Sequence, residues 1–151
     1  MIRIIVGVLF LATFLLVSYL FFPILNRMEK TKTDKISLSV VQWGFRTILK
    51  IAGTKVTVIG KENIPNEAAL FIGNHRSYFD ILLLYIQCER LTGFVAKDSI
   101  EKVPSLRVWM RYLYCLFLNR SDAREGLKTI LTAIEYVKKG ISICIFPEGT
   151  R

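Results

Sequence analysis

The sequence predicts an α/β domain with a mainly parallel sheet and flanking helices, preceded by membrane-associated helices at the N-terminus. Three observations carry this prediction. Residues 4–25 are almost wholly apolar, and an amphipathic segment follows at residues 36–52. Beyond residue 53, short apolar runs alternate with segments of helical periodicity, the pattern typical of α/β folds. We therefore divide the chain into N-terminal membrane-anchoring helices, residues 1–53, and an α/β domain, residues 54–151.

The apolar run is long enough to cross a membrane as a helix. At about 1.5 Å per residue it matches a bilayer core of roughly 30 Å, and Pro23 is expected to end or kink it. A cleaved signal peptide is disfavoured, because the run is long and no small-residue cleavage site follows it. Insertion into one leaflet stays open as an alternative.

Basic residues after the apolar run predict its orientation. Arg3 is the only charge before the run, and several follow it, so the positive-inside rule places the remaining chain in the cytosol. The following residues are Arg27, Lys30, Lys32 and Lys35.

Residues 26–35 are expected to form a polar linker, and residues 36–52 an amphipathic helix that Asp34 caps and Gly53 ends. Trp43, Arg46 and Lys50 suit a membrane interface. A helix packed on the domain core explains the same pattern equally well.

The remaining elements follow from periodicity and from breaker residues. Strands are predicted at residues 55–60, 68–72, 93–97, 114–118 and 141–146, with a turn at 61–67. Helices are predicted at residues 79–88, at 103–114 with Pro104 at its start, and from Ser121 or Asp122 to about Lys139, with Gly140 ending the last. The apolar face of that last helix carries Leu127, Ile130, Leu131, Ile134 and Val137.

Composition limits the kinds of partner. Lys and Arg number 21 against 12 Asp and Glu, which gives a net charge of +9 and favours an anionic membrane surface or a phosphorylated substrate. No segment has the pattern of a known nucleic-acid-binding module. Three scattered cysteines, without a Cys-x-x-Cys pair and with one histidine, predict reduced core thiols and no structural zinc.

The single histidine lies where a predicted strand gives way to a helix. His75 follows the Gly73-Asn74 break, and Asp80 comes after four intervening residues. A neutral imidazole is the usual general base near pH 7, and a carboxylate on its other nitrogen fixes the tautomer. In the structural alternative, His75 is a turn residue and Asp80 caps the next helix. This segment alone leaves both interpretations open.

Three motifs in order resemble those of the glycerolipid acyltransferases, the family of 1-acyl-sn-glycerol-3-phosphate (lysophosphatidic acid) acyltransferase. They are Asn74-His75 with Asp80, then Phe117-Leu118-Asn119-Arg120, then Phe146-Pro147-Glu148-Gly149-Thr150-Arg151. Together they span Asn74 to Arg151, and the third motif makes the match specific.

The resemblance implies acyl transfer from acyl-CoA or acyl-acyl carrier protein to the free hydroxyl of lysophosphatidate, giving phosphatidic acid for phospholipid biosynthesis. No metal and no cofactor beyond the acyl donor are expected. His75 is then the base and Asp80 orients it, while Lys97 lies beside the cleft. The implied substrate-binding residues are Asn74, Arg120, Glu148, Gly149, Thr150 and Arg151.

The chain also departs from the family pattern. It stops at Arg151, inside the third motif, where family members continue, so we expect a catalytic domain that is incomplete at its C-terminus. Cys115-Leu116 stands where a glycine often precedes the second motif. A non-catalytic, membrane-anchored lipid-binding module, or an acyltransferase for another glycerolipid acceptor, stays open as an alternative.

Overall fold

The structure is a computed structural model that describes residues 1–119 and 121–148. Within these residues four parallel strands form one sheet in the order β1-β4-β2-β3, as expected from the sequence. The strands are β1 (Leu70–Ile72), β2 (Thr92–Lys97), β3 (Leu116–Leu118) and β4 (Ser142–Ile145). The helices are α1 (Ile2–Arg27), α2 (Lys30–Ala52), α3 (Tyr78–Tyr85), α4 (Pro104–Tyr112) and α5 (Ala123–Lys138), with short 3₁₀ turns η1 (Lys61–Asn63) and η2 (Asp98–Lys102).

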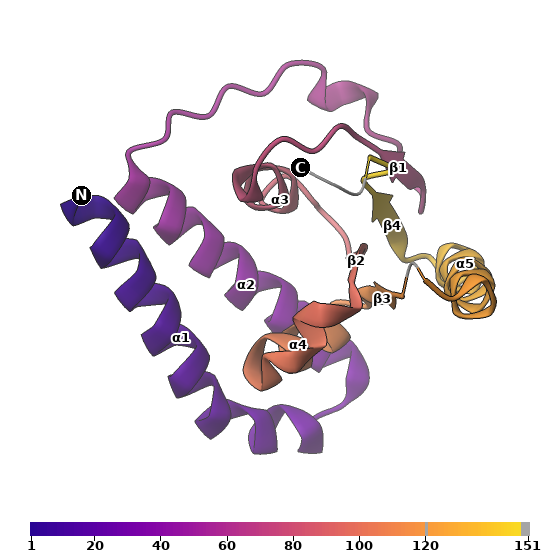
Figure 1. Cartoon of the computed structure of the whole chain (residues 1–151), viewed down its shortest axis with the longest axis horizontal. Helices are drawn as coiled ribbons and strands as arrows, with labels where there is room; N and C mark the ends of the chain where they lie inside the picture. Colours follow the sequence, from indigo (N-terminus) through magenta and orange to yellow (C-terminus); the bar gives the residue numbers. More distant parts are fainter. Residues whose placement is uncertain (120, 149–151) are drawn as a thin grey trace.

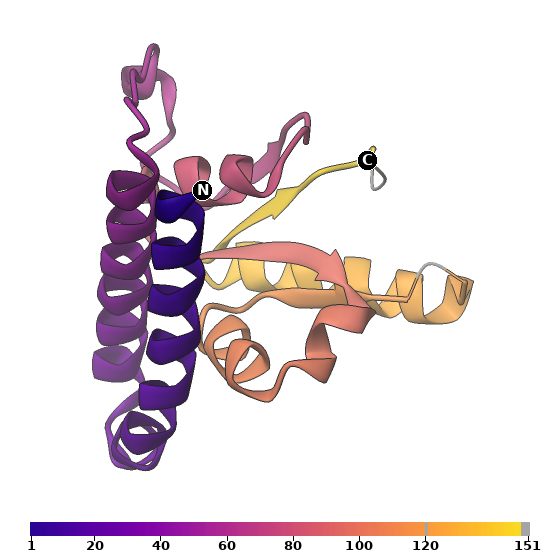
Figure 2. The same ribbon diagram turned by 60° about the vertical axis from the view of Figure 1, so that its left-hand side comes forward.

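Strand β4 lies between β1 and β2 and is the most deeply buried element. Ile143 and Cys144 are fully buried, and their side chains point to opposite faces of the sheet. Cys144 faces α1, α2, α3 and α4, whereas Ile143 faces α5. The sheet is therefore covered on both sides, as a parallel sheet requires (Figures 1 and 2).

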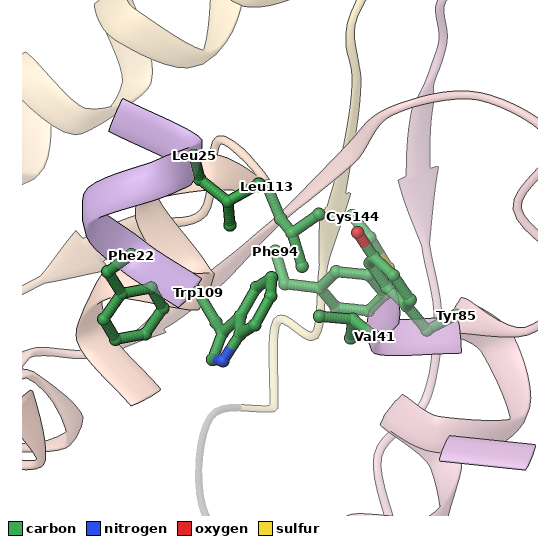
Figure 3. Close-up of a cluster of buried hydrophobic side chains, with 8 residues drawn as sticks. All are labelled: Phe22, Leu25, Val41, Tyr85, Phe94, Trp109, Leu113 and Cys144. Atoms are coloured by element: carbon green, nitrogen blue, oxygen red, sulfur yellow. The ribbon is translucent and has the colours of Figure 1, made fainter. Parts of the chain in front are cut away.

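The larger core cluster joins the two N-terminal helices to the sheet (Figure 3). Phe22 of α1 packs on Trp109 of α4 with ring centroids 5.5 Å apart, and Phe94 of β2 packs on Tyr85 of α3 at 5.4 Å. The helices α1 and α2 thus share one hydrophobic core with the α/β domain. The cluster comprises Phe22, Leu25, Val41, Tyr85, Phe94, Trp109, Leu113 and Cys144.

Helix α1 buries one narrow face and exposes the rest. It is long and apolar enough to cross a membrane by length and composition. Ile4, Leu16 and Leu20 each expose at least 70% of their surface. Pro23 does not end the helix, which continues to Arg27, but the last turns bend away from the axis of the first part (Figures 1 and 2).

The predicted linker at residues 26–35 is wrong. Helix α2 already begins at Lys30, so Asp34 lies inside the helix and does not cap it. Tertiary contacts explain the difference: the Tyr114 hydroxyl donates to Asp34 Oδ2 at 2.9 Å, and Lys30 Nζ lies 4.4 Å from the Tyr114 ring centroid. Gly53 ends the helix in the left-handed conformation, as predicted.

Helix α2 packs on the core, one of its two predicted roles. Val41 and Leu49 are buried, and Gln42 Nε2 donates to the carbonyl oxygens of Tyr85 and Cys88 at the end of α3. Trp43 contacts Phe10 of α1 and remains 56% exposed.

Residues 55–60 do not form the strand that the alternation of their side chains predicts. They form an extended, exposed segment between α2 and η1, and Ile59 is 93% exposed. A strand needs a partner for its backbone, and in the described residues β1 pairs only with β4. Helix α3 ends at Tyr85, three residues before its predicted end.

Helix α5 has Asp122 as its N-cap, as predicted, and ends at Lys138, one residue before the predicted end, but only part of its predicted apolar face is buried. Ala133 is buried against the sheet, while Leu127, Ile130 and Leu131 each expose more than half of their surface. Tyr136 and Val137 pack beside Ala133 on the same core cluster, so the last turns of α5 make its contact with the sheet.

The backbones of Gly93 and Tyr114 approach each other closely. Tyr114 is a non-glycine residue with a φ of 58°, between α4 and β3. A Cβ atom added at Gly93 would lie 2.2 Å from the Tyr114 carbonyl oxygen, so only glycine fits there.

We expect Gly93→Ala to destabilise the protein by at least about 1–3 kcal/mol, because neither backbone can move aside without breaking the β2–β3 pairing. Gly126→Ala is the matched control: its Cβ would meet Leu118 at 3.8 Å, and the helical site should gain roughly 0.5–1 kcal/mol. Thermal unfolding of both variants, followed by circular dichroism in detergent, measures the difference. Equal unfolding temperatures would contradict the close approach.

Candidate active site

The pairing of β1 with β4 brings two sequence motifs together at the carboxyl edge of the sheet. Ile72 pairs with Ile145, and the Gly73 amide donates to the Ile145 carbonyl oxygen at 3.2 Å. The residues that leave these strands, His75 and Phe146, therefore lie side by side. Their rings stack with centroids 4.7 Å apart and an interplanar angle of 26°.

Asp80 closes the turn that carries the histidine. Its Oδ2 atom accepts hydrogen bonds from the backbone amides of Arg76 at 2.6 Å and Ser77 at 2.7 Å. Ser77 Oγ accepts from the Phe79 amide at 3.1 Å, which completes a capping box at the start of α3. The Ser77 side chain is thus the N-cap of α3.

The same carboxylate oxygen faces the imidazole. His75 Nδ1 lies 3.4 Å from Asp80 Oδ2, within ion-pair range but not aligned as a hydrogen bond. Hydrogen bonds from the Ser77 and Arg76 amides hold the pKa of Asp80 below its usual range, and the nearby His75 acts in the same direction. Asp80 is therefore a carboxylate at neutral pH, and the predicted histidine–aspartate pair is brought together.

An open groove of about 490 Å³ lies beside this pair. One wall is the extended segment at residues 55–59, and the other is formed by α3 and the end of β4. Asn74 and Asp80 supply polar groups, and Lys55 supplies a positive charge. The apolar lining comes from Val56, Val58, Ile59, Leu83, Leu84 and Phe146.

A second hollow of about 230 Å³ lies at the carboxyl ends of β2, β3 and β4. Glu148 lines it, and Phe146 lines both hollows. Lys97 ends β2 next to Leu118 of β3. In the turn after β3, the Asn119 side chain accepts hydrogen bonds from the amide and the hydroxyl of Ser121, at 3.0 and 2.6 Å.

Four of the predicted substrate-binding residues lie outside the described residues: Arg120, Gly149, Thr150 and Arg151. Within residues 1–119 and 121–148, no three His, Cys, Asp or Glu side chains gather closely enough to hold a metal ion. The three cysteines are free thiols, and burial raises the pKa of Cys115 and of Cys144 to about 12.

Two features of the site are missing from the sequence-based prediction. One is the contact of Phe146 with the imidazole, although Phe146 was placed at the end of its strand. The other is the groove wall at residues 55–59, which was expected to be part of the sheet. The contact between Phe146 and His75 has one signal in the sequence. Phe146 is an aromatic residue at the end of a predicted strand, and that strand can pair with the strand before His75.

Residues 55–151 match the family model described as Acyltransferase. The chain belongs to this acyltransferase family. It is 31% identical to the probable 1-acyl-sn-glycerol-3-phosphate acyltransferase of Mycoplasma pneumoniae, over 68% of this chain and 40% of that protein. It is 35% identical to the 1-acyl-sn-glycerol-3-phosphate acyltransferase of Saccharomyces cerevisiae, over 71% of this chain and 36% of that protein.

A solved structure supports the assignment to the acyltransferase family. The 1-acyl-sn-glycerophosphate acyltransferase PlsC from Thermotoga maritima superposes with a TM-score of 0.71 at 27% identity, covering 99% of this chain and 63% of that one. This acyltransferase chain spans less than half the length of the curated relatives it matches.

The capping box makes a pH-dependent prediction for stability. Because folding lowers the pKa of Asp80, its charge contributes stability above the pKa of the unfolded chain, and this contribution is lost as the pH falls through the folded-state pKa. We expect Asp80→Asn to destabilise the protein at pH 7, with a loss that shrinks towards about pH 3. Guanidinium unfolding in detergent across this range measures it.

Ser77→Ala is the matched control at the same helix end. It removes an uncharged cap, costs about 1 kcal/mol, and should cost the same at each pH. An Asp80→Asn loss that is equally independent of pH would show that the carboxylate charge does not stabilise the turn.

Proposed function

We propose that the protein is a 1-acylglycerol-3-phosphate acyltransferase that moves a fatty acyl group from a thioester donor to the free hydroxyl of lysophosphatidate. The observation that carries the proposal is the pair of His75 and Asp80 at the carboxyl end of β1, beside an amphipathic groove. The similarity to proteins named for this reaction supports the choice of acceptor.

In the proposed reaction His75 acts on the acceptor hydroxyl. Nδ1 faces Asp80, which leaves Nε2 to accept the hydroxyl proton while the oxygen attacks the thioester carbonyl carbon. The imidazolium is stabilised by the Asp80 carboxylate. When the tetrahedral intermediate collapses, the carbon–sulfur bond breaks and the leaving thiolate takes the proton from His75, so the base is restored without a covalent enzyme intermediate.

The surroundings of the pair suit both ends of the substrates. The apolar wall of the groove suits acyl carbon atoms, and Asn74 offers an amide for polar atoms near the hydroxyl. Acyl-CoA or acyl-acyl carrier protein serves as donor. The acceptor phosphate is assigned to Arg120 and Arg151, and contacts to the rest of the acceptor head to Glu148, Gly149 and Thr150.

We further propose that α1 attaches the protein to a membrane with the α/β domain facing the cytosol. The exposed apolar surface of α1 supports attachment, and the basic residues that follow it support the orientation. Lysophosphatidate is itself a membrane lipid, so attachment brings the site to its substrate.

The test is thiol release from an acyl thioester by membranes carrying the protein, with lysophosphatidate as acceptor. We expect His75→Ala to lower the rate by about 10²- to 10⁴-fold, the contribution typical of a general base. Thr132→Ala, in α5 away from the groove, is the control and should retain full activity. Release that survives in His75→Ala would overturn the mechanism.

The outcomes also separate the alternatives. Release with a different glycerolipid acceptor, and not with lysophosphatidate, would keep the mechanism and change the substrate. Absence of release with every acceptor, from folded protein, would favour a non-catalytic lipid-binding module.

The phosphate assignment makes a separate prediction. Arg120→Ala should raise the KM for lysophosphatidate by roughly 10- to 100-fold, because it removes a charge-assisted hydrogen bond to phosphate, and should leave the KM for the acyl donor unchanged. Arg120→Lys restores the charge without the planar fork and should recover part of the loss. Initial rates at varied acceptor concentration measure this, and an unchanged acceptor KM in Arg120→Ala would remove Arg120 from the phosphate site.

A further inference from the structure

The contact between His75 and Asp80 does not by itself fix the plane of the imidazole. The carboxylate oxygen that faces Nδ1 already accepts two backbone hydrogen bonds at 2.6 and 2.7 Å, whereas it lies 3.4 Å from the ring nitrogen. The Asp80 carboxylate is fixed by these backbone amides, so it does not move with the imidazole if the ring shifts. Asp80 contacts the imidazole only at Nδ1, so this contact does not prevent the ring plane from rotating.

Phe146 supplies the missing constraint on the face of the ring. The two rings lie almost parallel, with centroids 4.7 Å apart and 26° between their planes. Stacking of this kind is stabilising beyond the area that it buries. The side chain of His75 is only 15% exposed, so the phenyl ring covers a face that water would otherwise reach.

Phe146 is itself held in place from two sides. It follows β4 directly, and its ring packs on Phe94 of β2 with centroids 6.1 Å apart. On the β1 side, a Cβ atom at Gly73 would lie 3.4 Å from Phe146 Cε1, so the ring lies close against the Gly73 backbone. The position of the phenyl ring is thus set by the sheet and not by a flexible loop.

We propose that Phe146 is a positioning residue, whose ring holds the imidazole of His75 in the plane that directs Nε2 at the acceptor hydroxyl. This inference rests on the proposed function, because it assigns a role in catalysis through His75. Phe146 also lines both hollows beside the site, so the test must separate positioning from substrate binding.

The first measurement does not depend on activity. The chain has one histidine, so protein labelled with ¹³C-histidine gives a single imidazole Cε1–H signal in an NMR spectrum of the full chain in detergent. A stacked phenyl ring shields this proton. We expect Phe146→Leu to move the signal downfield, and Phe45→Leu to leave it in place.

Phe45→Leu is a matched control. It makes the same change in the same hydrophobic core, where the Phe45 ring packs on Tyr85 with centroids 5.6 Å apart, on α2 and away from His75. Any effect of lost aromatic packing on stability is therefore shared by the two variants.

The second measurement is steady-state turnover. Phe146→Leu should lower kcat by roughly 10- to 100-fold, the cost of misplacing a catalytic group, with the KM values of both substrates unchanged. Phe146→Tyr keeps the ring and should restore both kcat and the NMR signal. Phe45→Leu should turn over at the wild-type rate.

The outcomes are distinguishable. An imidazole signal that does not move in Phe146→Leu overturns the stacking, and an effect on KM alone overturns positioning in favour of binding. If His75→Ala is inactive but Phe146→Leu matches Phe45→Leu in kcat, the positioning role alone fails. If His75→Ala retains activity, the proposed function fails and the positioning role fails with it.

Discussion

The site depends on the parallel pairing of β1 with β4. This pairing joins segments more than seventy residues apart and places Ile72 opposite Ile145. Side chains alternate between the faces of a sheet, so a slip of one residue would turn Phe146 towards α5 and away from the imidazole. Both strands are short, and Ile143 and Cys144, buried on opposite faces of β4, fix the register. The geometry of the candidate base is therefore decided in the core of the sheet, not in the loop that carries it.

In the turn after β1, one carboxylate both caps a helix and contacts the histidine. The sequence leaves Asp80 open as a helix cap or as the partner of the histidine; the structure shows the cap, and the same carboxylate oxygen lies 3.4 Å from His75 Nδ1. Helix α3 has only eight residues, so its cap satisfies a large share of its backbone amides. Because the same oxygen binds the amides of Arg76 and Ser77 and faces His75, the fold of the turn and the electrostatics around the imidazole cannot be changed separately.

Much of this arrangement was predictable, since alternation of strands and helices, breaker residues and caps are local signals. The four observed strands and the parallel sheet follow from them, whereas the pair of His75 and Asp80 was implied by the resemblance to the acyltransferases. The predictions that were wrong or missing share one cause. A local sequence pattern does not specify which distant segment an element packs against. The alternation of apolar and polar side chains at residues 55–60 indicates an extended chain, but in the described part of the protein no strand of the sheet pairs with it. The polar residues after Lys30 become helical through contacts with Tyr114, eighty positions away, and the stacking of Phe146 on His75 requires the strand register.

The apolar helix α1 is part of this same packed unit. Trp109 Nε1 donates to Ser18 Oγ at 2.7 Å, and Ser105 Oγ donates to the Leu15 carbonyl oxygen at 2.8 Å, both between α4 and the inner face of α1. Breaking them would leave buried polar atoms unpaired, which costs more than the bonds contribute. Helix α4 in turn shares the core cluster with Phe94 of β2, on which Phe146 packs. A continuous series of packed side chains therefore connects the exposed apolar surface of α1 to the ring that covers the imidazole.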